Sequence, residues 1–268
     1  MLSWLFLELT EYSWFRRIVW KPIYETLASR FPDEGWHFMN YGYIPMETEK
    51  HVGLPEKEEI HRYSLQLYHY LAIKTPIENK HVLEVGSGRG GGSRYIAQYL
   101  GPTSMTGMDL AKKAVTFSNK NHIAANLKYI AGNAENIPIE NNSFDVVINV
   151  ESCHAYGSVD KFLSEVRRIL KPGGKLLLTD LRGGPGMEIL KKQLKTSGLT
   201  QLSEEDITIN VVKAIEADDV HKWNRIKSVV PGRFQKAFGE FAGVAGSQIH
   251  KQLTNRDLIY YRFVLEKA

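Results

Sequence analysis

Three residues that can hold or move a proton follow two apolar segments in the middle of the chain. Glu151 and His154 come after Ser143–Val150, and Asp180 ends Lys175–Asp180; we expect both segments to be strands. A neutral histidine is available as a general base near pH 7, because its unperturbed pKa is about 6.5. His154 is therefore a candidate catalytic base, or else a structural histidine that caps the following turn.

The two acids beside this histidine have more than one possible task. Asp180 can orient His154 or bind a substrate hydroxyl, and it can equally cap a loop. Glu151 can face a cofactor, the substrate or solvent. These three residues share no spacing typical of metal ligands, so we expect a site without metal. Cys153 is adjacent to His154, but we expect a small buried thiol rather than a nucleophile.

A glycine-rich segment precedes these residues in the chain. Val82, Leu83 and Val85 predict a buried strand, and Arg94–Leu100 predicts a helix. Between them lies a turn in which a bound cofactor can approach the backbone, since glycine has no Cβ to fill that space. The residues of this turn that we expect to touch a cofactor are Gly86, Ser87, Gly88 and Gly90.

Glu84, two residues before Gly86, restricts what the turn can bind. A carboxylate this close repels the pyrophosphate of a dinucleotide and attracts a cation. This counts against a nicotinamide-dependent oxidoreductase. S-adenosylmethionine fits better, because it carries an ammonium and a sulfonium and no phosphate.

The same segment carries a family resemblance. Val82–Gly90 resembles the first motif of the class I S-adenosylmethionine-dependent methyltransferases, and Leu170–Gly174 resembles a turn that is frequent in that superfamily. The resemblance implies a Rossmann-like α/β fold. Five strand–helix units between Lys80 and Asp180 independently predict a parallel sheet with helices on both faces.

The resemblance also implies which further residues hold the cofactor. Asp109 ends the expected strand Met105–Asp109, about twenty residues beyond the glycines, where such folds bind ribose hydroxyls. Leu110 would lie against the adenine. A stretch like Asn40–Tyr43 often closes over the cofactor in such enzymes, through Tyr41 or Tyr43 here. The remaining expected cofactor contacts are Asn133, Ala134, Glu135 and Asn149, with Asn133 standing where the family usually has an aspartate.

We expect three parts in one integrated domain. Residues 1–75 form a helical, aromatic-rich cap, 76–182 the cofactor-binding core, and 183–268 a helical insertion with the final strands. The resemblance implies a seven-stranded, mostly parallel sheet whose last strand, near Ile259–Leu265, is antiparallel. The aromatic cap packs on the core, walls a pocket for an apolar substrate, or rests at a membrane interface.

The segments Asn149–His154, Gly88–Gly92 and Phe241–Gln248 resemble a narrower bacterial group. That group methylates lipid and polyketide hydroxyls, as in the phthiotriol/phenolphthiotriol dimycocerosate methyltransferases. The resemblance implies transfer of a methyl group to the hydroxyl of a hydrophobic molecule, with His154 as the base and S-adenosylhomocysteine as the product. The alternative enzyme is a C-methyltransferase acting on a sterol- or prenyl-type alkene, and a cofactor-binding protein without catalysis is a third hypothesis.

Composition limits the partners. The chain of 268 residues has a net charge of +4 and no block of Lys and Arg, so we expect no nucleic-acid partner. Its one cysteine suits a reducing compartment, and we find neither a signal peptide nor a run of about 20 apolar residues. We therefore expect a cytoplasmic monomer or homodimer with at most peripheral membrane contact.

Overall fold

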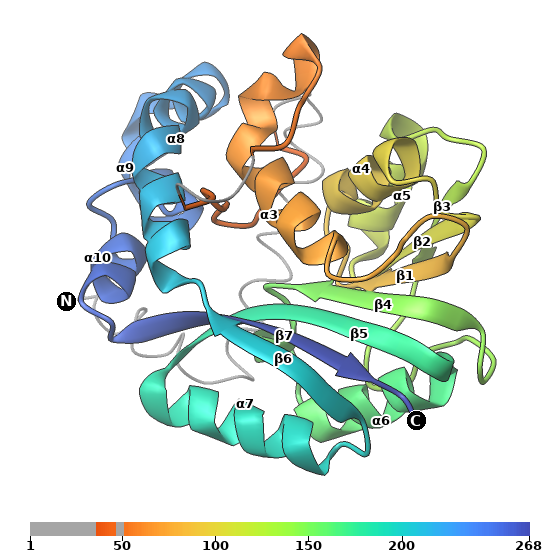
Figure 1. The fold of residues 1–268 in the computed structure, drawn as a ribbon. Helices are drawn as coiled ribbons and strands as arrows, with labels where there is room; N and C mark the ends of the chain where they lie inside the picture. Colours follow the sequence, from red (N-terminus) through yellow and green to blue (C-terminus); the bar gives the residue numbers. More distant parts are fainter. Residues whose placement is uncertain (1–35, 47–50) are drawn as a thin grey trace.

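The computed structural model describes residues 36–46 and 51–268, so the expected aromatic helices at 1–31 lie outside the described residues. The described elements form one sheet with helices against it (Figure 1). In chain order they are η1 (Glu56–His61), α3 (Arg62–Ala72), β1 (His81–Val85), α4 (Gly91–Tyr99), β2 (Ser104–Asp109), α5 (Lys112–Asn121), β3 (Leu127–Ala131), β4 (Phe144–Val150), η2 (Cys153–Ala155), α6 (Val159–Ile169), β5 (Leu170–Gly183), α7 (Gly184–Thr196), β6 (Thr200–Asp206), α8 (Thr208–Val229), α9 (Gly232–Ala242), α10 (Gln248–Thr254) and β7 (Leu258–Glu266).

The seven strands lie in the order β3-β2-β1-β4-β5-β7-β6. β1 to β5 are parallel to one another, and β7 is inserted antiparallel between β5 and β6. The predicted sheet is confirmed, with its seven strands and its antiparallel last strand. Parallel strands require crossover connections, which α4, α5 and α6 supply.

Alternating apolar residues along the strands pack against helices on both faces. Val82, Ile148 and Leu177 belong to one buried cluster, together with side chains of α3, α4 and α8. Their chain neighbours Leu83 and Val147 belong to a second cluster, with α6 and α7. Because successive strand residues point to opposite faces, nearly continuous apolar strands bury both sides of the sheet.

Two element boundaries differ from the sequence-based expectation. The residue pattern predicts a helix over Lys112–Ala125, but the helix ends at Asn121, because His122 takes an extended conformation and its ring Nε2 lies 2.8 Å from the carbonyl oxygen of Arg89. The residue pattern predicts a helix over Glu204–Val229 and allows a strand near Leu199–Thr208, and the structure has both, with α8 beginning at Thr208. The preceding residues are strand β6, paired with β7, where Glu205 forms an ion pair with Arg262.

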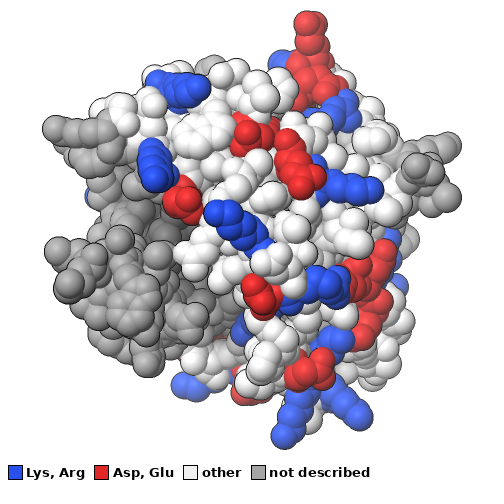
Figure 2. Space-filling model, turned by 90° about the vertical axis from the view of Figure 1, so that its left-hand side faces the viewer, with Lys and Arg blue, Asp and Glu red and all other residues white. Residues whose placement is uncertain are grey.

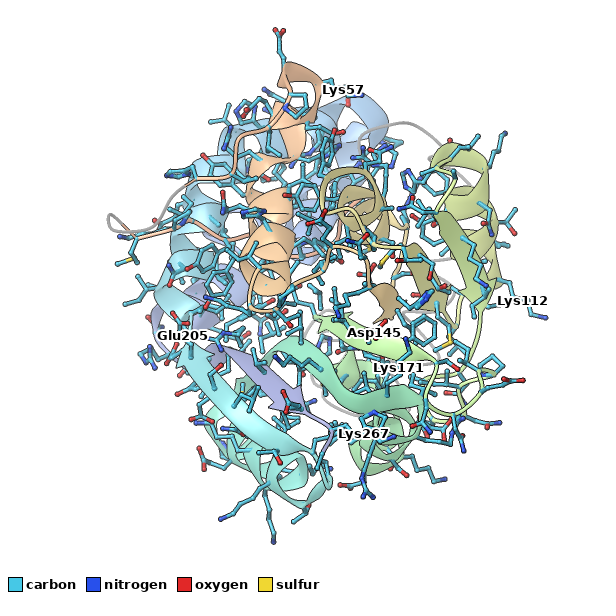
Figure 3. All side chains as sticks on the ribbon, turned by 45° about the vertical axis from the view of Figure 1, so that its right-hand side comes forward. Lys57, Lys112, Asp145, Lys171, Glu205 and Lys267 are labelled. Atoms are coloured by element: carbon cyan, nitrogen blue, oxygen red, sulfur yellow. The ribbon has the colours of Figure 1, made fainter. Side chains whose placement is uncertain are left out.

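The expected turn Leu170–Gly174 is an irregularity inside β5. Phe144 pairs with Leu170, whereas Val146 pairs with Lys175, so the intervening residues bulge out of the ladder. Gly173 permits this with a φ of +73°. Lys171 reaches Asp145 at the start of β4 with an N–O distance of 3.0 Å, and the two side chains lie side by side in Figure 3. The bulge therefore ties the amino ends of β4 and β5 together.

Helices α8, α9 and α10 lie on the side of the sheet toward which β4 and β5 run (Figure 1). Basic and acidic side chains are interspersed over the described residues of this side (Figure 2). Within 36–46 and 51–268, none of the helices is both long and apolar enough to cross a membrane.

The packing of α4 on α3 leaves no room for a side chain at Gly92. A Cβ there would lie 2.0 Å from Cζ of the buried Tyr68 ring. We therefore expect Gly92→Ala to lower the free energy of unfolding by about 1–3 kcal/mol, as overpacked cores do. Urea unfolding would measure it. Gly184→Ala is the control, because no atom lies within 4 Å of that Cβ. Equal stability of the two variants would contradict the packing argument.

Candidate active site

Strand register brings the expected site residues to one edge of the sheet. Val85 pairs with Met108, so Asp109 follows at the same level, and Glu84 pairs with Ile148, which places Asn149 beside Val85. Val150 pairs with Thr179, so Asp180 comes next to the segment that follows β4. In open α/β sheets, ligands bind beyond these carboxyl ends.

The glycine turn after β1 is held by both neighbouring strands. The N–H groups of Gly86 and Ser87 donate to the carbonyl of Met108 in β2, at 2.8 and 3.0 Å. Gly86 has a φ of +81°, and a Cβ there would overlap Ser152. Gly88 also has a positive φ, +52°, but no atom lies within 4 Å of its Cβ position. The turn is therefore packed tightly at Gly86 and leaves space beside Gly88.

Asp109 closes this turn from the side of β2. Its carboxylate accepts from the N–H of Gly88 and from the N–H of Ala111, both at 2.8 Å. Burial raises the pKa of Asp109, against the hydrogen bonds that favour the charged form. Leu110 follows with 49% of its surface exposed. The pair offers a carboxylate and an apolar surface next to the space at Gly88.

Asn149 presents a buried acceptor at the end of β4. Its amide Nδ2 donates to the carbonyl of Val85 at 2.8 Å and to the hydroxyl of Tyr156 at 3.0 Å. A carbonyl oxygen only accepts, so this contact fixes the amide orientation and leaves Oδ1 as an acceptor. Asn149 Oδ1 and Ser87 Oγ are both buried and have no hydrogen-bond partner among the described residues.

These two atoms allow us to test whether the residues of the site fit S-adenosylmethionine. A buried acceptor without a partner costs free energy, unless a ligand supplies the donor. The ammonium of S-adenosylmethionine is such a donor, and the carboxylate of Asp109 suits its ribose hydroxyls. The space at Gly88 and the exposed Leu110 suit its adenosine part. The site therefore fits S-adenosylmethionine.

Glu84, which we expect to contact the cofactor, forms hydrogen bonds with two helices. Its carboxylate is fully buried and accepts from the hydroxyls of Tyr68 in α3, at 2.6 Å, and Ser93 in α4. Burial raises the pKa of Glu84 to about 7, although both hydrogen bonds lower it. Glu84 thus ties the glycine turn to two helices, and its direct contact with a cofactor cation stays a prediction.

The segment after β3 forms a compact turn. The N–H of Glu135 donates to Oδ1 of Asn133 at 3.0 Å, and Ala134 is buried. The Glu135 carboxylate accepts from the N–H of Gly157, so it joins this turn to the loop after η2. The predicted adenine contact of Asn133 therefore competes with a bond inside its own turn and stays a prediction.

The structure brings His154 and Asp180 together. His154 Nδ1 lies 2.6 Å from Asp180 Oδ1, while Asp180 Oδ2 accepts from Arg182 Nε at 2.9 Å and from the Cys153 thiol at 3.2 Å. Asp180 has no exposed surface, and His154 keeps 29% of its side chain exposed. Burial would raise the pKa of Asp180, but His154 and Arg182 outweigh it and hold that pKa below its usual value.

Glu151 lies between this pair and the segment 36–46. It has a φ of +46°, which is rare outside glycine and asparagine. Its Oε1 accepts from the backbone N–H of Tyr41 and from the hydroxyl of Tyr260, both at 2.9 Å. Burial raises the pKa of Glu151 to about 7. Tyr43, the other residue expected to close over the cofactor, is instead a core residue that stacks on Tyr70, with 4.1 Å between the ring centroids.

Several residues of the site were not expected from the sequence. Three of them, Tyr68, Ser93 and Tyr260, come from α3, α4 and β7, which are distant along the chain. The other two, Tyr156 and Arg182, lie close in sequence to Asn149 and Asp180. Tyr68 has no signal in its own sequence neighbourhood. Arg182 could have been noticed, because it stands two residues from Asp180 on the same face of a strand. Among the described residues, no three His, Cys, Asp or Glu side chains form a group suited to a metal ion.

Comparisons with known proteins agree with this geometry. A family model described as a methyltransferase domain matches residues 83–178. A fatty-acid O-methyltransferase of Mycolicibacterium smegmatis is 39% identical over 73% of this chain and 71% of its own. A phthiotriol/phenolphthiotriol dimycocerosates methyltransferase of Mycobacterium leprae is 33% identical over 93% of this chain and 92% of its own.

Two solved structures share the fold. The cyclase SpnF superposes with a TM-score of 0.70 at 18% identity, covering 92% of this chain and 94% of that one. The geranyl diphosphate C-methyltransferase of Streptomyces coelicolor superposes with a TM-score of 0.64 at 18% identity, covering 92% and 99%. The fold and the site thus define a class I methyltransferase. The chain belongs to the S-adenosylmethionine-dependent methyltransferases, in the group of the phthiotriol/phenolphthiotriol dimycocerosates enzymes.

Asp109 gives the first prediction for cofactor binding. We expect Asp109→Ala to weaken binding of S-adenosylmethionine and S-adenosylhomocysteine by about 10-fold or more, because charge-assisted hydrogen bonds to the ribose are lost. Calorimetric titration measures both ligands, with NAD as the negative control. Asp257→Ala, at an exposed position, is the matched variant. Unchanged affinity in Asp109→Ala would remove this residue from the cofactor site.

The raised pKa of Glu84 predicts how the free energy of unfolding depends on pH. Its folded-state pKa of about 7 lies above the ordinary pKa of 4.5 for a glutamate, so it stabilises the fold fully below pH 4.5. That stabilisation, on the order of 3 kcal/mol, is lost as the pH rises through 7. We expect Glu84→Gln to lose less stability between pH 4.5 and 8 than the wild type in urea unfolding. The exposed Glu78→Gln should keep the wild-type slope, and parallel curves for all three would contradict the assignment.

Proposed function

We propose that the enzyme transfers a methyl group from S-adenosylmethionine to a hydroxyl of a hydrophobic lipid- or polyketide-like molecule, with His154 as the general base. The observation that carries this proposal is the 2.6 Å contact between His154 Nδ1 and Asp180 Oδ1 at the carboxyl edge of the sheet. A base is needed because an alcohol must lose its proton as it attacks.

The contact between His154 and Asp180 determines which ring nitrogen of the histidine carries the proton. Asp180 has a lowered pKa and is ionised, so it only accepts hydrogen bonds, and His154 Nδ1 must carry the proton. In the neutral imidazole, Nε2 is then the nitrogen without a proton, and it can accept the hydroxyl proton. The negative Asp180 stabilises the imidazolium that forms, as it does in other histidine–carboxylate pairs.

Arg182 and Cys153 keep Asp180 in this orientation. Both donate to Oδ2, which leaves Oδ1 for the histidine. Because Asp180 is fully buried, its charge would be unfavourable without these donors. We therefore assign Arg182 as a positioning residue and not as a group that touches the acceptor.

The cofactor residues proposed above would hold the second substrate. When bound, S-adenosylmethionine supplies an electrophilic methyl group for in-line displacement. Asp109 would fix its ribose, and Asn149 Oδ1 and Ser87 Oγ would accept from its ammonium. Holding both partners at attack distance provides much of the catalysis in such a transfer.

The names of the relatives support the proposed class of acceptor. Their printed names describe methylation of fatty acids and of phthiotriol-type lipids. A hydroxyl acceptor needs His154, whereas a fatty-acid carboxylate is already ionised at neutral pH and needs no base. Long-chain alcohols and acids therefore give different results in variants of His154.

We expect His154→Ala and Asp180→Asn each to lower kcat for a long-chain alcohol by about 10²- to 10⁴-fold, while affinity for S-adenosylmethionine changes less than about twofold. Transfer from labelled S-adenosylmethionine measures the rate. His221→Gln, at an exposed position of α8, is the control and should keep wild-type turnover. Equal losses of turnover and cofactor affinity would exclude the role as base.

C-methylation of a sterol- or prenyl-type alkene remains the alternative. Glu151 gives it some support, because a buried carboxylate beside His154 could steady a carbocation. Mass spectrometry of the product separates the two: an O-methyl group is lost on ether or ester cleavage, and a C-methyl group is retained. Peripheral membrane contact through residues 1–31 and the oligomeric state stay predictions of the sequence.

A further inference from the structure

Ser152 is a hydroxyl residue at the edge of the site that the proposed function does not use. It stands between Glu151 and Cys153 in the turn that follows β4, and it is half-buried. A Cβ at Gly86 would overlap its Oγ, so the side chain of Ser152 packs on the glycine turn. This hydroxyl therefore borders both the candidate cofactor residues and the turn that carries His154.

The hydrogen bonds around Tyr156 determine which hydroxyl proton is available to a ligand. The Tyr156 hydroxyl accepts from Asn149 Nδ2 at 3.0 Å. An amide nitrogen only donates, so the single proton of the phenol must go to another acceptor. Ser152 Oγ lies 2.7 Å away, the usual O–O distance of such a bond, whereas the carbonyl oxygen of Val85 lies 3.5 Å away. We therefore assign Tyr156 as the donor and Ser152 as the acceptor.

Ser152 then keeps its own proton for a ligand. The bond with Tyr156 is the one hydrogen bond of its side chain within residues 36–46 and 51–268. A serine hydroxyl carries one donor, and this bond does not use it. Asn149 has the opposite capacity, because its buried Oδ1 is an acceptor without a partner in the same part of the chain. A donor and an acceptor thus belong to two side chains that bind one phenol oxygen.

The methionine part of S-adenosylmethionine carries the matching pair of groups. Its ammonium is a donor and its carboxylate is an acceptor, and both are attached to the same carbon atom. The backbone N–H groups that open the glycine turn cannot serve this carboxylate, because those of Gly86–Gly88 already donate to acceptors of β2. A hydroxyl donor beside Asn149 supplies what these groups do not.

We propose that Ser152 donates a hydrogen bond to the carboxylate of the bound cofactor, and that Tyr156 is a positioning residue that orients this hydroxyl. The inference rests on the proposed function in placing the ammonium at Asn149. Tyr156 joins the two binding side chains through hydrogen bonds to one atom. Because Cys153 and His154 follow Ser152 directly in the chain, a bound cofactor would also hold the turn that carries the proposed base.

Equilibrium binding tests the proposal without turnover. S-adenosylhomocysteine and decarboxylated S-adenosylhomocysteine, which keeps the ammonium but lacks the carboxylate, are titrated calorimetrically into the full chain. We expect the wild type to bind the first ligand at least about tenfold more tightly. Ser152→Ala should lower this ratio of affinities by about tenfold, because one charge-assisted hydrogen bond is lost. Its affinity for the decarboxylated ligand should change less than about twofold, since that ligand has no group for the hydroxyl.

Three further variants separate the parts of the proposal. Tyr156→Phe keeps the Ser152 hydroxyl but no longer orients it, so we expect the ratio to fall by about threefold. Asn149→Ala should weaken the decarboxylated ligand by about tenfold, because that ligand still carries the ammonium. Ser164→Ala, at an exposed position of α6, is the matched control and should keep the wild-type ratio.

The ratio of two affinities within one variant is insensitive to partial unfolding. If Ser152→Ala keeps the wild-type ratio, or if Ser87→Ala is the variant that lowers it, Ser152 only packs on the glycine turn and the proposal is wrong. An unchanged ratio in Tyr156→Phe would refute its positioning role. The proposed function fails separately, through unchanged affinity of Asn149→Ala for the decarboxylated ligand or through absence of methyl transfer with binding intact.

Discussion

The register between β1 and its two parallel neighbours is the constraint on which the rest of the site depends. Val85 pairs with Met108, and Glu84 pairs with Ile148. This alignment brings the glycine turn, Asp109 and Asn149 to one edge, although 64 residues separate Val85 from Asn149. A shift by one residue would turn every side chain of β1 to the opposite face and bury its apolar residues wrongly. Packing on both faces therefore fixes the site geometry.

Buried polar side chains then connect this edge to the helices around it. Glu84 binds Tyr68 of α3 and Ser93 of α4, and Glu151 binds Tyr41 and Tyr260. Each carboxylate is buried, and burial raises both pKa values to about 7. Such groups contribute less to stability than to specifying one arrangement, because an alternative packing would leave a carboxyl without donors. We consider this the reason for two costly acids in one small region.

The sequence predicted the sheet well, because strands and glycine turns are local patterns. It predicted individual contacts less well. The cofactor contact of Glu84 stays a prediction, but its bond to Tyr68 was not expected, although Val82 packs toward α3 and α4 and Glu84, two residues later, lies on the same face. The alternation of side chains along β1 could therefore have predicted on which face of the sheet Glu84 lies. The approach of Tyr68 and Tyr260 could not, since their distance to the site depends on the packing of α3 and β7. The proximity of His154 and Asp180 was one of several alternatives, and strand order decided among them.

The fold alone does not determine the reaction, since a cyclase shares it at a TM-score of 0.70. The function must therefore be argued from the charged groups at the carboxyl edge of the sheet. Asp180 is held between a histidine and an arginine, and the buried Glu151 accepts from Tyr41 and Tyr260. The charge of Asp180 thus serves the histidine, and the arginine keeps that carboxylate in place. A buried carboxylate bound to one ring nitrogen of a partly exposed histidine is the arrangement that the proposed proton transfer requires.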